Sequence, residues 1–224
     1  MKRGLSFLIL SIVVEYNKST GGGFGMKKRI ITISREFGSG GRTVGRRVAE
    51  RLGIAYYDKE LIEKIAEGTG LSEAFIREYG EHAPGKNVFS YSFLGRTANG
   101  MSMQDYIWTV QRKIIKELAG KEPCVIVGRC ADYILRNRED CLHVFIHSSL
   151  EKKVERIVKI YGETSDKPEK RLEDKDKKRS VNYHYYTDRK WGDARNYHLS
   201  LDSGEFGIER CVDIIAGLVE QTQI

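Results

Sequence analysis

One unit of the chain, residues 29–58, restricts its possible folds more than any other stretch. It opens with the β-branched run RIITIS, residues 29–34, which is typical of a buried strand and leads into a glycine-rich turn. An amphipathic helix follows, and its apolar face is marked by side chains four residues apart: Val44, Val48 and Leu52. Residues 54–57 then form a second short strand. The order strand, glycine loop, helix and strand predicts a βαβ unit, in which the two strands run parallel.

The same alternation resumes later in the chain. Strand signals at residues 124–127, 142–146 and 197–201 are each followed by an amphipathic helix. Five strands that alternate with helices predict an α/β fold with a doubly wound parallel sheet. Two segments interrupt the pattern, because residues 59–119 are mostly helical and residues 162–193 are intensely charged. A length of 224 residues fits one domain that carries such insertions.

The glycine-rich turn, SREFGSGGRT at residues 34–43, has the position and composition of a phosphate-binding loop. In the register of the P-loop pattern G-x-x-x-x-G-K-[ST], Glu36 replaces the first glycine and Arg42 replaces the lysine. Glycines let the backbone turn its N–H groups toward an anion, and the following helix adds partial positive charge. We therefore expect this loop to bind nucleotide phosphates through Gly38, Ser39, Gly40, Gly41, Arg42 and Thr43.

Two side chains of the loop suit phosphate chemistry. Arg42 is a permanent cation that can fork across two phosphate oxygens, and the Thr43 hydroxyl can bind Mg²⁺. Glu36 is unfavourable beside phosphates, so we expect it to point away or to pair with an arginine such as Arg35. The alternative is a glycine turn that only caps a helix. The strand-loop-helix context and the Arg-Thr pair favour the phosphate loop.

Two runs of the chain are specific at the level of a family. They are IITISREFGSGGRTVGRRVAERLGIAYYDKELIEKIAEGTGLSE and, later, VIVGRCADYIL. Together they resemble the cytidylate kinase-like proteins, a branch of the P-loop nucleoside monophosphate kinases, over residues 27–220. The resemblance implies a P-loop three-layer sandwich, ATP and Mg²⁺ as cofactors, and a nucleoside monophosphate as phosphoryl acceptor, with CMP or dCMP favoured. It also implies that residues 59–119 are a helical substrate-binding insert and that residues 162–193 are a basic lid.

The resemblance further implies roles for single residues. Arg129, in the run GRCAD, corresponds to the arginine of a G-R-D motif that contacts the monophosphate, although it also fits a surface arginine at a helix start. Asp132 is a second substrate-binding candidate, shifted by two residues from the family aspartate. True cytidylate kinases have a lysine where Arg42 stands. We expect the catalytic cations to be Arg42, Arg129, Arg179 and Arg171.

The lid and the second strand supply the remaining candidates. Arg171, Lys175, Lys178 and Arg179 are spaced so that they would share one face of a helix. Arg179 is the first lid candidate for gripping the transferring phosphate, with Arg171 and Arg156 behind it. Asp58 ends the second strand at the edge of the sheet where α/β proteins bind ligands. Its carboxylate suits water-mediated binding of Mg²⁺ or substrate, and equally suits capping of the next helix.

Charge narrows the range of partners. The formal net charge is +7, and residues 151–190 hold 13 basic and 9 acidic side chains, so the basic excess is concentrated at the expected lid. This distribution favours a mononucleotide over a nucleic acid, for which no fold motif is present. The leading hypothesis is ATP-dependent phosphoryl transfer to a nucleoside monophosphate. A P-loop kinase with a non-nucleotide acceptor and a nucleotide-binding regulator with little turnover remain as alternatives, the latter because Arg42 replaces lysine.

Residues 1–25 differ from the rest of the chain. Their apolar run, residues 5–14, is about half the length needed to span a bilayer, so we expect no membrane anchor. We predict a non-native or disordered extension, with Met26 as an alternative start and residues 26–224 as a single kinase domain.

The four cysteines form no C-x-x-C pair and indicate a reduced, cytoplasmic protein. An aromatic group after the lid suits packing onto the core or a homodimer contact: Tyr183, Tyr185, Tyr186 and Trp191.

Overall fold

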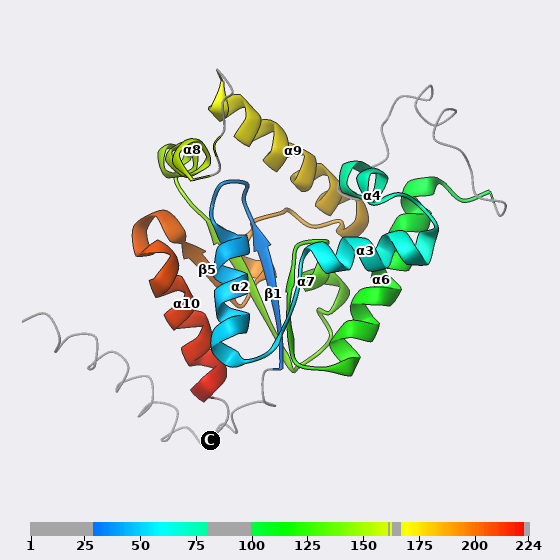
Figure 1. Cartoon of the computed structure of the whole chain (residues 1–224), viewed down its shortest axis with the longest axis horizontal. Coiled ribbons are helices and arrows are strands. Elements are labelled where there is room, and N and C mark those ends of the chain that lie inside the picture. The colour runs from blue at the N-terminus through cyan, green and yellow to red at the C-terminus, as the bar shows by residue number, and fades with distance from the viewer. Residues whose placement is uncertain (1–28, 80–99, 161, 163–166, 222–224) are drawn as a thin grey trace, which may run out of the picture.

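A computed structural model describes residues 29–79, 100–160, 162 and 167–221 of the chain. In this part, five parallel strands form one sheet in the order β2-β3-β1-β4-β5, with β1 at its centre (Figure 1). The strands are β1 (Ile30–Arg35), β2 (Ala55–Tyr57), β3 (Cys124–Val127), β4 (Cys141–His147) and β5 (Leu199–Asp202). The predicted parallel α/β sheet of five strands is therefore confirmed.

Helices cover both faces of this sheet (Figure 1). On one face lie α2 (Gly41–Leu52) and α10 (Ser203–Gln221), and on the other lie α3 (Lys59–Thr69), α6 (Met103–Lys121) and α7 (Ala131–Ile134). The β1 strand serves both cores because successive side chains point to opposite faces. Ile30 joins the core under α3 and α6, whereas Ile31 and Ile33 join the core under α2. All three isoleucines are fully buried, which accounts for the continuous apolar run of this strand.

The remaining helices lie near the end of the sheet that is formed by the carboxyl ends of the strands. They are α4 (Glu73–Tyr79), α8 (Leu150–Lys159) and α9 (Pro168–Thr187), followed by the short 3-10 helix Ala194–Asn196. Figure 1 shows α8 and α9 above the end of β1 and the start of α2. The loops that follow β1, β2 and β3 meet there, because parallel strands have their carboxyl ends at the same end of the sheet. The fold thus brings the glycine loop, the end of β2 and the charged helix α9 together.

Some expected boundaries shift. The last strand was expected over 197–201 and lies at Leu199–Asp202, because the 3-10 helix occupies the chain up to Asn196 and Tyr197 follows as its cap. The last helix begins at Ser203, directly after this strand, with a non-helical Gly207 at φ 75° inside it. Residues 1–25 and residues 80–99 of the expected insert lie outside the described residues. Among the described helices, none is both long enough and apolar enough to cross a membrane.

Candidate active site

The loop between β1 and α2 has the backbone geometry of an anion-binding nest. Gly38 and Gly40 have φ values of 79° and 78°, a region that L side chains rarely adopt. Gly41 begins α2, and a Cβ there would lie 2.5 Å from the Cβ of Arg35. Gly38 and Gly40 are thus required by their positive φ angles, and Gly41 is required by the close approach of the Arg35 side chain. Their backbone is held at the amino end of α2, where the helix dipole favours an anion.

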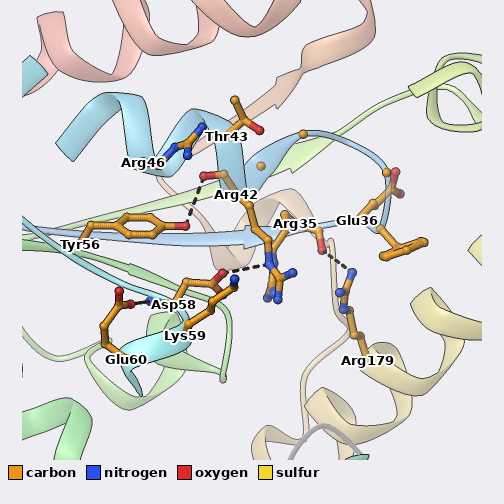
Figure 2. Close-up of a pocket in the computed structure, with 14 residues that line it drawn as sticks. Arg35, Glu36, Arg42, Thr43, Arg46, Tyr56, Asp58, Lys59, Glu60 and Arg179 are labelled. Carbon is orange, nitrogen blue, oxygen red and sulfur yellow. Dashed lines mark hydrogen bonds and ion pairs between the residues drawn. The ribbon is translucent and has the colours of Figure 1, made fainter. Parts of the chain in front are cut away.

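A cleft of about 530 Å³ opens in front of this loop (Figure 2). Its volume falls within the range of small-molecule sites. The lining residues include five of the six loop residues expected to bind phosphates, namely Gly38, Gly40, Gly41, Arg42 and Thr43. Ser39 is instead fully buried, and its Oγ donates a hydrogen bond to the carbonyl oxygen of Glu36 at 2.9 Å. Its side chain therefore shapes the loop from inside.

Arg42 and Asp58 face each other across the cleft (Figure 2). The Arg42 Nε lies 3.1 Å from the Asp58 Oδ2, and the arginine is half-exposed while the carboxylate is nearly buried. Asp58 precedes α3, yet its side chain makes no capping hydrogen bond there, so its placement favours the site over the cap. A phosphate that enters the cleft would compete with Asp58 for the guanidinium. Burial raises the pKa of Tyr56 to about 12, and its neutral hydroxyl donates to the Arg42 carbonyl oxygen at 3.3 Å.

The residues present fit a magnesium ion. Mg²⁺ is usually held by one or two carboxylates or hydroxyls together with phosphate oxygens and several waters. Thr43 and Asp58 line the same cleft and supply one hydroxyl and one carboxylate. The described residues contain no group of three acidic, histidine or cysteine side chains that would form an all-protein cage. This donor set matches an ion that is bound mainly through the nucleotide.

Glu36 pairs with a residue other than the one expected. Its Oε2 lies 3.0 Å from the Lys153 Nζ of α8 and accepts a hydrogen bond from the Ser148 N–H at 3.3 Å. The expected partner, Arg35, points elsewhere because its guanidinium lies against Gly128. Lys153 also lies 3.3 Å from the Asp176 Oδ2 of α9. The carboxylate of Glu36 is thus neutralised by a buried lysine.

Asp176 connects the helix α9 directly to the loop. Its Oδ1 accepts a hydrogen bond from the Phe37 N–H at 2.6 Å and lies 3.5 Å from the Arg179 Nη1. Burial raises the pKa of Asp176 above its usual value, whereas the Phe37 N–H, Lys153 and Arg179 act to lower it. Lys153, Glu36 and Asp176 therefore form one largely buried network that joins α8, the loop and α9, with the Glu36 side chain 26% exposed. We call these three residues the loop latch.

The expected lid cations separate into two groups. Arg179 lines the cleft, and its Nη1 donates to the Arg35 carbonyl oxygen at 3.4 Å (Figure 2). Arg171, Lys175 and Lys178 instead line a separate surface hollow on α9. The spacing places all four positions on one side of α9, yet the Arg179 side chain reaches the cleft while the other three line the outer hollow. A role for Arg171 in gripping phosphate stays a prediction.

Arg156 supports the loop from α8. Its Nη1 donates to the Gly38 carbonyl oxygen at 2.9 Å, so this cation shapes the loop backbone. It does so beside Gly40, where an added Cβ would approach both the Arg156 guanidinium and the side chain of Ile208.

Arg129 lies in an unusual turn after β3. Gly128, Arg129 and Cys130 have φ values of 75°, 57° and 55° in succession, and such non-glycine residues typically cost about 1–3 kcal/mol each. The turn is tied to the insert, because the Gln111 side-chain amide donates to the Arg129 carbonyl oxygen at 3.0 Å. The Arg129 Nη1 donates to the Ile76 carbonyl oxygen of α4 at 3.4 Å. Arg129 is therefore a buried link between core and insert, and it also lines a hollow next to the cleft.

Asp132 lies behind the site and outside both hollows. It is 2% exposed, and its two oxygens accept hydrogen bonds from the Ser34 Oγ at 3.0 Å and the Tyr183 hydroxyl at 2.7 Å. Burial raises its pKa, although both hydrogen bonds act to lower it. The structure thus places Asp132 where it orients Ser34 and Tyr183, and direct contact with a substrate stays a prediction. Tyr183 packs onto the core, as expected for one member of the aromatic group.

The chain matches the model of the cytidylate kinase-like family over residues 30–205. It belongs to this family. A relative from Archaeoglobus fulgidus, a cytidylate kinase, is 30% identical over 199 residues, which cover 87% of this chain and 96% of the relative. The predicted family is therefore confirmed, and with it the relation to kinases that transfer phosphoryl groups from nucleotides.

Solved structures share the fold of this cytidylate kinase-like chain. An uncharacterized protein from Eubacterium ventriosum has a TM-score of 0.64 at 27% identity, over 85% of this chain and 98% of that one. Shikimate kinase from Acinetobacter baumannii, in complex with shikimate, has a TM-score of 0.51 at 18% identity, over 88% and 95% of the two chains. A gluconokinase from Sinorhizobium meliloti has a TM-score of 0.50 at 18% identity, over 87% and 95%. The last two likenesses establish the P-loop kinase fold alone.

The close approach at Gly41 gives a first prediction for this family member. Gly41→Ala should lower the free energy of unfolding by about 1–3 kcal/mol, because its Cβ would overlap the Arg35 Cβ, which the backbone of β1 fixes. Gly217→Ala, in the interior of α10 with no atom within 4 Å, should raise it by about 0.5–1 kcal/mol. Urea denaturation of both variants measures the difference. Losses of equal size at the two positions would contradict the packing at Gly41.

Proposed function

We propose that the protein transfers the γ-phosphoryl group of ATP to a nucleoside monophosphate, with CMP and dCMP as the favoured acceptors. The observation that carries this proposal is the cleft in which the glycine loop, Arg42, Thr43, Asp58 and Arg179 converge. The archaeal relative, a cytidylate kinase that this chain matches over 96% of its length, supports the choice of acceptor.

Phosphoryl transfer depends mainly on positioning and on positive charge around the moving group. In this proposal the N–H groups at the start of α2 and the Arg42 guanidinium bind the ATP phosphates. Thr43 and Asp58 would hold Mg²⁺, which neutralises phosphate charge when bound. Arg179 faces the same cleft from α9 and would stabilise charge that develops on the transferring group. The helix α9, held on the loop by Asp176, would keep water from the reacting phosphate.

A coupled assay of ADP release tests this function. The full chain is mixed with ATP and Mg²⁺ and then with each nucleoside monophosphate in turn, and with a panel of small hydroxyl compounds. We expect one monophosphate to raise ADP release at least tenfold above the basal rate, and removal of Mg²⁺ with EDTA to abolish it. Stimulation only by a non-nucleotide hydroxyl compound would contradict the proposed acceptor. Binding of ATP with no stimulated turnover would contradict the proposed reaction and support a regulator.

A further inference from the structure

A second, smaller hollow adjoins the cleft at the carboxyl end of β1. It holds about 30 Å³, and we call it the side chamber. Its lining consists of Ser34, Arg35, Gly128, Arg129, Cys130, Arg179, Asn182, Tyr183 and Trp191. Arg35 and Arg179 line both the side chamber and the cleft, so the two spaces are neighbours that share these two side chains.

The side chamber is surrounded by buried cations. Arg35 and Arg129 are 6% and 8% exposed, and the Arg179 side chain is 13% exposed. None of the residues that line the chamber is acidic. Guanidinium groups bind oxyanions through forked, charge-assisted hydrogen bonds, which strengthen where water is scarce. The chamber therefore has the composition of a site for a small anionic group.

Arg35 has a fixed path into this space. Its stem lies where a Cβ of Gly41 would stand, and its guanidinium lies where a Cβ of Gly128 would stand. These two glycines belong to the start of α2 and to the turn after β3, which are separate elements of the fold. Any larger residue at either place would displace the arginine. The backbone is thus shaped to let a strand-end arginine reach between the glycine loop and Arg129.

Asn182 provides an independent sign that the chamber takes a ligand. It lies on α9, three residues after Arg179, and it is 6% exposed. Its Oδ1 is buried and has no hydrogen-bond partner among the described residues. A buried polar atom of this kind is normally satisfied by a protein group, a water or a ligand. A ligand that carries a hydroxyl or amino group beside its anion would satisfy it.

We propose that Arg35 and Asn182 bind the phosphoryl acceptor, with Arg35 holding the acceptor's oxyanion in the side chamber. The chamber has room for about two to three water-sized atoms, which suits phosphate or carboxylate oxygens and excludes a pyrimidine ring. The rest of the acceptor lies outside the chamber, and its hydroxyl or amino group reaches the Asn182 Oδ1. Because Arg35 also lines the cleft, it links the acceptor's anion to the donor phosphates. This inference rests on the proposed phosphoryl transfer.

Binding of inorganic phosphate tests the side chamber apart from turnover. The full chain is first saturated with MgADP, which occupies the glycine loop, and phosphate is then titrated by calorimetry. We expect one phosphate to bind the wild-type protein, and Arg35→Gln to weaken this binding at least tenfold. Lys175→Gln removes one positive charge from the outer face of α9, and it should leave phosphate affinity within twofold. Melting temperatures measured in parallel show which variants are folded.

Asn182→Asp keeps the test decisive if Arg35→Gln does not fold. The substitution keeps the size of the side chain and places a negative charge in the chamber, so phosphate binding should again fall at least tenfold. Absence of phosphate binding to the ADP-saturated wild type would overturn the inference. So would wild-type affinity in the folded variants at both positions. If phosphate binding depends on Arg35 but no monophosphate stimulates ADP release, the anion site stands and the proposed reaction fails.

Discussion

Replacement of Arg42 by alanine should lower kcat/KM for ATP by about a hundredfold to a thousandfold, the usual cost of removing one preorganised charged contact to a transferring group. Arg42 lines the cleft at the start of α2 and is the cation in the position of the P-loop lysine. Arg42→Lys should stay within about tenfold of the wild type, because a point charge at the same place still reaches the phosphates. Steady-state kinetics with the best acceptor from the ADP-release assay measures both values.

Arg51→Ala is the matched control for this prediction. Arg51 lies on the last turn of the same helix and pairs with Asp213 and Glu220 at the surface, far along α2 from the glycine loop. Its loss should leave kcat/KM within twofold. If Arg42→Ala is as active as Arg51→Ala, the cation at position 42 does not bind the ATP phosphates, and the assignment of the cleft fails.

Lys153→Met should lower the free energy of unfolding by about 3 kcal/mol, because removal of one partner leaves a buried charge uncompensated. Lys153 is 8% exposed and lies within 3.0 Å of Glu36 and 3.3 Å of Asp176. Without its ammonium group the two carboxylates of the loop latch repel each other next to the glycine loop. Urea denaturation at pH 7 measures the loss. The methionine keeps most of the side-chain volume, so packing changes little.

The same variant should show a pH-dependent loss. Burial raises the pKa of Asp176 above its usual value of 3.8, so the folded protein binds this proton more tightly than the unfolded chain. The contribution of Asp176 to the free energy of unfolding is therefore fully present below about pH 4. It is lost as the pH rises through the pKa that Asp176 has in the folded protein. Removal of Lys153 takes away a positive charge that holds this pKa down. The stability deficit of Lys153→Met should thus be largest at neutral pH and should shrink as the pH falls toward 4.

Lys152→Met controls for the loss of a lysine on the same helix. Lys152 is half-exposed and pairs with Glu155 at 3.5 Å on the surface, an arrangement that contributes little in water. Its replacement should change the free energy of unfolding by less than about 0.5 kcal/mol at any pH. Equal deficits for the two variants, or a deficit of Lys153→Met that does not depend on pH, would contradict the buried loop latch.

The sequence predicts the parts of this fold that depend on local patterns. The run from residue 29 to residue 58 contains its own strand, glycine turn and amphipathic helix, so the βαβ unit follows from spacing alone. The strand order is not local, because β1 pairs with β3 and β4, which lie about a hundred residues away. The start of the last strand is not local either, since Leu199 is the first residue of β5 that lies opposite a residue of β4, Val144.

The residues of the candidate site also fall into those that a local motif predicts and those that only the folded structure reveals. The glycine loop and Arg42 are consecutive in the chain, and their motif alone is enough to bring them to the cleft. The partner of Glu36 is 117 residues away and the partner of the Phe37 N–H is 139 residues away, so only the packing of α8 and α9 reveals them. In the sequence Arg35 belongs to the glycine-rich turn and stands out only as a possible partner of Glu36. Its path past Gly41 and Gly128 needs three separate elements in place.

In the proposed reaction, a phosphoryl group moves from ATP to a nucleoside monophosphate in the cleft between the glycine loop and α9. Incubation of the full chain with Mg²⁺, CMP and ATP labelled at the γ-phosphate, followed by separation of the products, tests it most directly. We expect the label to appear in CDP, and Arg42→Ala to make far less labelled CDP in the same time. Label that stays in ATP or appears only as inorganic phosphate, with CMP and with every other monophosphate, would contradict it.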